Sequence, residues 1–191
     1  HLLNLVNDIL DVTQIESDHI TLTQEITNIN TVVRDCINQI FALSQQRGVE
    51  IRNLLDDKGE YEVLADGLRV KQVMLNLLSN AINYNRVHGK ITITSEKRGD
   101  SFLRILVTDT GIGIADKFKP DVFKAFNRLG ADSMLTGKGT GIGLTISKVL
   151  IEKLGGKIGF ESNENVGSTF WFELPLAKKE QAEASHAEMN G

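Results

Sequence analysis

The sequence predicts an α+β fold, a two-layer sandwich in which about three helices cover one face of a mixed sheet of about five strands, preceded by an N-terminal hairpin-type helix. Three observations support this prediction. Apolar residues recur at helical spacing in three internal segments, short β-branched runs lie between those segments, and no internal repeat is visible. The 191 residues, 41% of them hydrophobic, are enough for one compact core of ordinary domain size.

The opening residues His1 to Ser17 predict a helix with an apolar seam. Leu2, Val6 and Ile9 follow one another at steps of four and three, so their side chains share one face. Because no capping residue precedes this pattern, we expect the helix to begin upstream.

The first half of the main domain predicts an extended piece, two helices and two strands. Asn30 is a candidate N-cap for the first helix, which Gly48 would end, and Asp66 is a candidate N-cap for the second. The elements in order are an extended piece at Ile20–Ile26, a helix to Gly48, strands at Val49–Leu55 and Tyr61–Leu64, and a helix to about Tyr84.

The second half predicts two strand pairs separated by an irregular loop and a third helix. The elements are strands around Ile91–Ile93 and at Phe102–Thr108 joined through Gly99-Asp100, a loop at Ala115–Gly137, a helix at Thr140–Leu154 ended by Gly155-Gly156, and strands at Lys157–Glu161 and Thr169–Leu174. The polar residues 178–191 are expected to be a tail or linker.

Composition excludes several functional classes. With 25 acidic against 21 basic residues, the chain lacks the basic footprint of a nucleic-acid binder. The single cysteine, Cys36, has no partner for a disulfide, which favours a reducing, cytoplasmic setting. No apolar run is long enough for a membrane helix, so we expect no direct membrane contact.

Three asparagines form a polar stripe on the second internal helix. Asn76, Asn80 and Asn83 fall at steps of four and three, so they share a face. A solvated helix face would explain this pattern, but asparagine is a poor helix former, and an amide oxygen is a suitable ligand for Mg²⁺.

Two glycine-containing segments suggest close approach to a ligand. Asp109-Thr110-Gly111-Ile112-Gly113 follows an apolar strand, although an ordinary turn has similar chemistry. Gly137-Lys138-Gly139-Thr140-Gly141-Ile142-Gly143-Leu144 places four glycines at every second position before a helix, which is typical of a site for a polyphosphate.

Other common sites are disfavoured by spacing. The glycine-rich segment fits neither a Walker A loop nor a dinucleotide fingerprint, because Asp132 and Ile142 stand where glycines would be required. The four histidines, His1, His19, His88 and His186, lack zinc-ligand spacing, and no nucleophile elbow is present.

Taken in order, the segments Gln72–Tyr84, Asp109–Ile114 and Gly139–Leu144 resemble the catalytic, ATP-binding domain of sensor histidine kinases, a branch of the gyrase, chaperone and mismatch-repair ATPase superfamily. Val122–Arg128 resembles the phenylalanine box of its ATP lid, and Gly167–Pro175 resembles its closing strand. The opening helix resembles the end of the second helix of the dimerisation hairpin, whose first helix carries the phosphoacceptor histidine. His1 is therefore not the acceptor.

The resemblance implies three regions: 1–17, the end of the hairpin; 18–177, the ATP-binding domain; and 178–191, the tail. It implies ATP and Mg²⁺ as cofactors, Asn80 as metal ligand, Asn76 beside metal and phosphates, and Asp109 as acceptor of the adenine amino hydrogen. The other implied nucleotide contacts are Asn83, Tyr84, Gly111, Gly113, Ile114, Phe126, Arg128, Lys138, Gly139, Thr140, Gly141, Ile142, Gly143, Leu144 and Thr169.

The implied activity is transfer of the γ-phosphate to the hairpin histidine, for relay to a response-regulator aspartate, in a homodimeric parent that is cytoplasmic or membrane-anchored. Asn83 and Ala125 depart from the family's usual lysine and proline. These departures leave open a degenerate module that binds ATP or no nucleotide and regulates a kinase partner. A serine-phosphorylating or chaperone-like relative is the third alternative.

Overall fold

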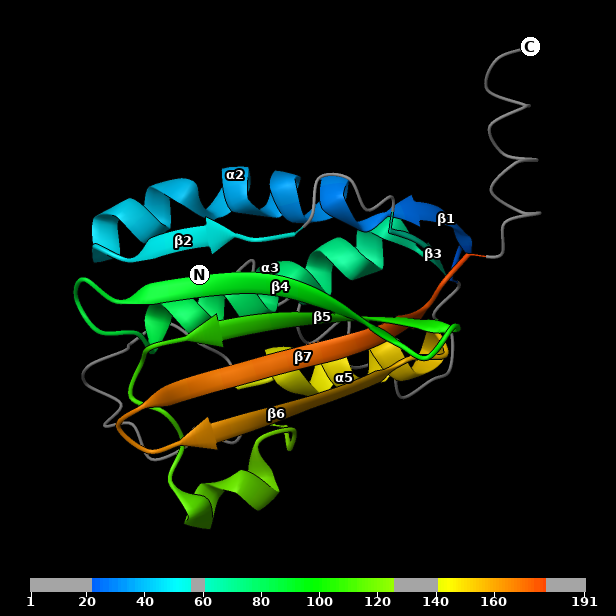
Figure 1. Cartoon of the computed structure of the whole chain (residues 1–191). Helices are drawn as coiled ribbons and strands as arrows, with labels where there is room; N and C mark the ends of the chain where they lie inside the picture. Colours follow the sequence, from blue (N-terminus) through cyan, green and yellow to red (C-terminus); the bar gives the residue numbers. More distant parts are fainter. Residues whose placement is uncertain (1–21, 56–60, 126–140, 178–191) are drawn as a thin grey trace.

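The computed structural model describes residues 22–55, 61–125 and 141–177. Within these ranges the chain forms a five-stranded sheet in the order β2-β4-β5-β7-β6 (Figure 1). Its strands are β2 (Glu50–Asn53), β4 (Lys90–Arg98), β5 (Phe102–Asp109), β6 (Lys157–Asn163) and β7 (Gly167–Pro175). Only β2 and β4 pair in parallel, so the sheet is mixed, as the sequence predicts.

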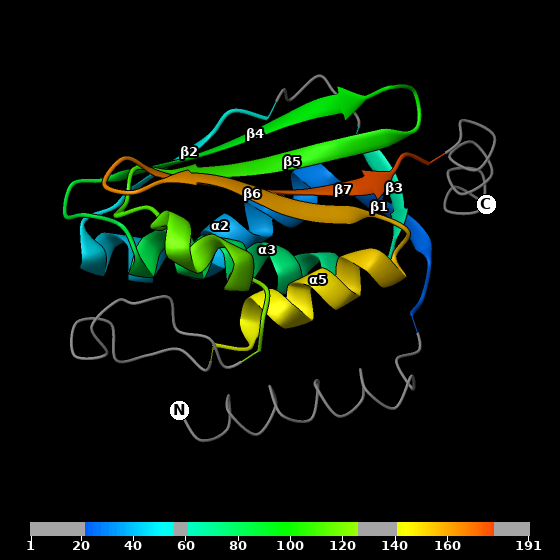
Figure 2. The same cartoon turned by 90° about the horizontal axis from the view of Figure 1, so that it is seen from below.

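Three helices cover one face of this sheet (Figure 2). They are α2 (Ile29–Arg47), α3 (Gly67–Asn83) and α5 (Gly143–Lys153). The helix ends follow the capping residues: Asp66 Oδ1 accepts from the Arg69 amide at 3.1 Å, and Gly48 ends α2 in the left-handed conformation. The predicted two-layer sandwich is therefore confirmed within the described part of the chain.

The start of α2 differs from the sequence prediction. Its N-cap is Asn28, whose side chain accepts from the Thr31 amide at 3.1 Å, whereas Asn30 lies inside the helix. The reason is a second, two-stranded sheet, in which β1 (Glu25–Asn28) pairs antiparallel with β3 (Glu62–Ala65). This pairing holds the chain extended as far as Asn28, so the helix begins directly after it.

The loop predicted between residues 115 and 137 begins with regular structure, because Asp116–Asp121 form the 3-10 helix η1. Lys119 forms an ion pair with Asp116 across this turn at 2.6 Å. The rest of this loop beyond Ala125 lies outside the described residues.

The core lies between the helices and the inner face of the sheet. Leu78 and Met74 of α3 are fully buried, and they belong to one cluster with Ile105 of β5 and Phe172 of β7. Cys36 of α2 is buried too, and loss of hydration raises the pKa of its thiol to about 11, so it is an unreactive packing residue.

The outer face of the sheet carries no helix in the described ranges and is held by charged pairs. Arg104 of β5 donates from Nε to Glu173 Oε1 of β7 at 2.9 Å, and its guanidinium lies 3.9 Å from the centre of the Trp171 ring. Side chains alternate along β5 and β7, so neighbouring residues on a strand lie in different layers. No described helix is both long and apolar enough to cross a membrane.

Candidate functional site

The polar stripe of α3 lies at the boundary with α5. Asn76, Asn80 and Asn83 are all partly buried, so they do not form the freely solvated face that the pattern alone allowed. Asn76 Nδ2 donates to Ser147 Oγ of α5 at 2.9 Å, and Asn83 Nδ2 donates to Ser79 Oγ at 3.3 Å. Within the described residues, the Asn80 side chain has no hydrogen-bond partner, which leaves its amide oxygen available to a ligand.

The first turn of α5 comes unusually close to this stripe. A Cβ atom on Gly143 would lie 2.2 Å from Asn76 Oδ1, so only glycine permits the approach. The helix begins here, and its first amide groups have no partners within the helix. The structure thus brings Asn76, Gly143 and a helix N-terminus together, which is an arrangement suited to phosphate oxygens.

Asp109 occupies the end of β5 and is buried, with 8% of its surface exposed. Its Oδ1 accepts from the Gly111 amide at 2.8 Å and from the Ser168 amide at 3.3 Å. Both of these hydrogen bonds fall on Oδ1, so within the described chain Oδ2 is left as a free acceptor. Burial raises the pKa of this carboxyl, and the two backbone donors only partly offset the effect.

The loop after Asp109 is held by its neighbours. The Ile112 amide donates to the Tyr84 carbonyl at 3.1 Å, and the Asn165 amide donates to the Ile112 carbonyl at 2.6 Å. The Arg86 guanidinium donates to the Asn165 carbonyl. This network joins the end of α3, the Asp109 loop and the β6–β7 turn. It brings two of the predicted site residues, Tyr84 and Asp109, to the same end of the site.

The structure places the predicted residue Thr169 elsewhere. Thr169 Oγ1 lies 3.0 Å from Thr108 Oγ1 on the outer face of the sheet, away from the helix layer. Its neighbour Ser168 is the cross-strand partner of Asp109 and is buried beside it. The predicted residue Thr169 therefore lies away from the other predicted site residues, whereas Ser168, which the sequence does not single out, lies beside Asp109. Which of the two lies opposite Asp109 depends on the strand register.

Phe123, at the start of the segment similar to a lid, is anchored to the body of the domain. Its carbonyl accepts from Thr145 Oγ1 at 2.9 Å, and its ring packs edge-on against Phe160 at 5.9 Å between centroids. Five predicted contacts lie outside the described residues: Phe126, Arg128, Lys138, Gly139 and Thr140. The other predicted backbone positions are placed: Ile142 is the N-cap of α5, Gly143 and Leu144 begin that helix, and Gly141 comes just before it. Ile114 lies in the loop between β5 and η1.

A group of three His, Cys, Asp or Glu side chains able to hold a metal ion does not occur in the described part of the chain. The donor set on α3 consists instead of amides. Amide oxygens suit Mg²⁺ when phosphate and water oxygens complete the octahedron. The residues present therefore fit a Mg²⁺–nucleotide better than a metal held by protein alone.

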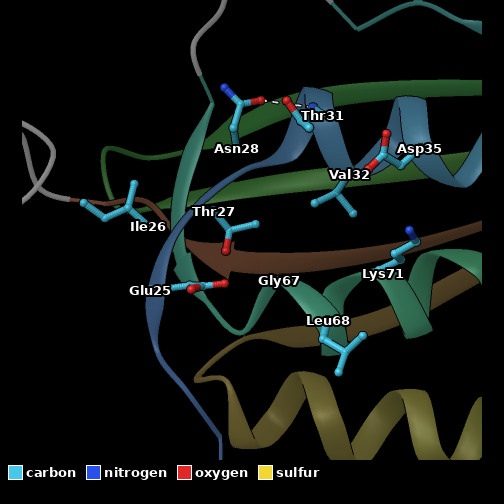
Figure 3. A pocket seen from close by; sticks show the side chains of 10 residues that line it. All are labelled: Glu25, Ile26, Thr27, Asn28, Thr31, Val32, Asp35, Gly67, Leu68 and Lys71. Atoms are coloured by element: carbon cyan, nitrogen blue, oxygen red, sulfur yellow. Dashed lines mark hydrogen bonds between the residues drawn. The ribbon is translucent and has the colours of Figure 1, made fainter. Parts of the chain in front are cut away.

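An open groove of about 420 Å³ lies at the other end of α3 (Figure 3). It is bounded by β1, the first turns of α2 and the first turn of α3, with Glu25, Asp35 and Lys71 among its side chains. None of the predicted nucleotide contacts lines it, so it is separate from the site around Asp109 and Asn76.

Together, the helix-on-sheet sandwich, the asparagine stripe and the buried carboxylate at a strand end define a nucleotide-binding domain of the ATPase class. Residues 65–178 match the family model described as histidine kinase-, DNA gyrase B-, and HSP90-like ATPase. This chain belongs to that family.

Curated relatives and solved structures agree with this assignment. The chain is 33% identical over 198 residues to the sensor protein GacS of Pseudomonas syringae pv. syringae, covering 100% of this chain and 22% of the relative. It is 32% identical over 180 residues to the signal transduction histidine-protein kinase BarA of Escherichia coli K12, covering 92% and 20%. The chain thus spans about a fifth of these relatives.

The crystal structure of full-length ShkA in complex with AMPPNP superposes with a TM-score of 0.80 at 29% identity, over 93% of this chain and 36% of ShkA. The catalytic domain of histidine kinase ThkA gives a TM-score of 0.68 at 32% identity, over 82% and 97%. The similarity to ThkA covers nearly all of that domain, so the described fold is that of a histidine kinase catalytic domain.

Proposed function

We propose that this chain is the catalytic domain of a two-component sensor histidine kinase, which transfers the γ-phosphate of Mg²⁺–ATP to a histidine on a dimeric helical hairpin. The observation that carries the proposal is the buried Asp109, with Oδ1 fixed by two backbone amides and Oδ2 left as an acceptor, in a domain of this ATPase family. Named relatives are sensor kinases, and the ShkA structure holds an ATP analogue.

Asp109 is proposed to select adenine. An ionised carboxylate accepts hydrogen bonds but donates none, so Oδ2 can accept from the exocyclic amine of adenine. Guanine presents a carbonyl at that position, and two acceptors repel each other while both lose hydration. The two amide donors on Oδ1 hold the carboxylate in the plane needed for this recognition.

Asn80 is proposed as the protein ligand of Mg²⁺, with Asn76 beside the phosphates. The Mg²⁺ ion supplies charge neutralisation of the polyphosphate when it is bound. Ser147 fixes the Asn76 amide so that Oδ1 lies at the first turn of α5. The amide groups of that turn would then receive phosphate oxygens.

Transfer to a histidine is favoured over hydrolysis by the chemistry of Asn76. An amide cannot remove a proton from water, so at this position it cannot act as the general base that hydrolysis requires. Phosphoryl transfer mainly requires positioning and charge neutralisation, which the amides and the helix N-terminus would provide.

The partners are part of the same proposal. One solved relative is ThkA in complex with the response regulator TrrA, at a TM-score of 0.69 and 28% identity. By analogy, the parent of this chain would act as a homodimer whose hairpin receives the phosphate and passes it to a response regulator. A cytoplasmic location for the domain follows from its ATP requirement.

The test is phosphorylation of a histidine-bearing hairpin supplied in trans, with γ-labelled ATP and Mg²⁺. The proposal expects label on the hairpin that acid removes and base does not, because phosphohistidine is acid-labile. Acid-stable label would indicate a serine kinase instead. Tight ATP binding without any transfer would favour the degenerate module. The structural argument for that module is Asn83, which replaces the family's usual lysine and donates to Ser79.

A further inference from the structure

Two buried serines lie beside Asp109, and neither is among the nucleotide contacts predicted from the sequence. Ser162 of β6 and Ser168 of β7 are 8% and 7% exposed, and their Oγ atoms are 2.9 Å apart. Ser168 is the cross-strand partner of both Ser162 and Asp109. The pair therefore stands beside the carboxylate proposed to recognise adenine.

The contacts of Ser162 fix the direction of the serine–serine hydrogen bond. Ser162 Oγ accepts from the Ile114 amide at 2.8 Å and donates to the Gly167 carbonyl at 3.1 Å. A hydroxyl has one proton, so Ser162 cannot also donate to Ser168. All three contacts are satisfied at once only if Ser168 donates its proton to Ser162.

Because the Ser168 proton is used in this bond, the Ser168 oxygen can only accept hydrogen bonds from its other neighbours. Asp109 Oδ2 also presents only lone pairs, and Ser168 is tied to the same carboxylate through its amide. Acceptors on two residues that face each other across adjacent strands match an amino group, which carries two hydrogens, and oppose a carbonyl. Buried polar groups discriminate strongly because an unmatched group stays unpaired.

We propose that Ser162 is a specificity-determining positioning residue, which turns the Ser168 proton away from the base and so makes Ser168 a second acceptor for the 6-amino group of adenine. This inference rests on the proposed function and adds to it a source of purine selectivity beyond Asp109. Without the Ser162 hydroxyl, the Ser168 proton can rotate and donate to a 6-carbonyl.

The experiment measures the Kd values of ATP and of inosine triphosphate, which carries a carbonyl in place of the 6-amino group. Both are measured with Mg²⁺, for the unmodified chain and for Ser162→Ala. The preference for ATP, taken as the Kd of inosine triphosphate divided by that of ATP, should fall about 5-fold in Ser162→Ala, because one neutral hydrogen bond is worth about that factor. Thr108→Ala is the matched control, since it removes one hydroxyl of the Thr108–Thr169 pair on the outer face of the same sheet. Its ratio should stay unchanged.

A second variant keeps the proposal testable if Ser162→Ala unfolds after the Ile114 amide loses its acceptor. Ser168→Ala should weaken ATP binding about 5-fold and leave inosine triphosphate binding nearly unchanged. In that background, adding Ser162→Ala should no longer move the ratio. An unchanged ratio in folded Ser162→Ala, or in Ser168→Ala, would overturn the proposal. Failure of the unmodified chain to bind ATP would instead refute the proposed function itself.

Discussion

The two ends of the site are built differently. At the base end, Asp109, Ser162 and Ser168 are buried and joined by short hydrogen bonds to backbone amides and to one another. At the phosphate end, Asn80 and Asn83 are partly exposed, and the amides make few contacts with the fold. A preformed base end can select the nucleotide, whereas an open phosphate end has to be completed by the metal, the phosphates and the acceptor.

The largest expected effect tests the phosphate end. Asn80→Ala should lower histidine phosphorylation by at least about 100-fold, since it removes the proposed metal ligand. Its unfolding temperature should not fall, because alanine is the better helix former and the described structure gives the Asn80 side chain no bond to lose. The measurement is labelled transfer at saturating Mg²⁺ beside a thermal melt. Unchanged transfer would remove Asn80 from the site.

The next effect concerns stability at the base end. Gly113 has φ of 65°, and a Cβ there would lie 1.9 Å from the Asn163 carbonyl oxygen. Gly113→Ala should cost about 3 kcal/mol in the free energy of unfolding, from the left-handed conformation and the clash together. Denaturant unfolding measures this loss.

Gly99→Ala is the matched control for that substitution. Gly99 has nearly the same φ, 61°, but a Cβ there would meet no atom within 4 Å. It should therefore cost only about 1 kcal/mol. Equal costs for the two variants would show that the Asp109 loop is not held tightly against the β6–β7 turn.

A smaller effect follows from the raised pKa of Asp109. Burial disfavours the ionised carboxylate of Asp109, so the protonated carboxyl stabilises the folded state. This stabilisation is fully present below the pKa of the unfolded chain and is lost as pH rises through the pKa of the folded chain. Asp109→Asn, which cannot ionise, should therefore become more stable relative to the unmodified chain as pH rises through that window. ATP affinity should move the opposite way, weakening as pH falls, because protonation removes an acceptor. Melting curves and titrations across that range measure both trends.

The smallest effect tests Asn83, which stands where the family usually has a lysine. Asn83→Lys should tighten ATP binding about 5-fold, since a positive charge near the phosphates is worth about 1 kcal/mol in a solvated site. Adenosine binding is the control and should not change, because adenosine carries no phosphate. A gain for adenosine as large as that for ATP would mean that the lysine acts on the base end rather than on the phosphates.

The fold and the outline of the site could be predicted because they depend on local patterns. Helical and alternating periods gave the layers, and Asp66 and Gly48 marked helix ends through their own capping chemistry. The errors came from long-range pairing. The β1–β3 pairing moved the cap from Asn30 to Asn28, and the β5–β7 register put Ser168, not Thr169, beside Asp109. Register is settled by contacts between segments that are distant in the sequence, so local patterns alone do not reveal it.

The central claim is that a preformed base end selects adenine through Asp109. The most direct measurement is calorimetric titration of the nonhydrolysable ATP analogue with Mg²⁺ into the unmodified chain and into Asp109→Asn, with the GTP analogue as control. The asparagine keeps an oxygen for the Gly111 and Ser168 amides but turns a donor toward the base. The account predicts tight ATP-analogue binding that is lost in the folded variant and absent for the GTP analogue. Equal binding by both proteins, or equal binding of both nucleotides, would contradict it.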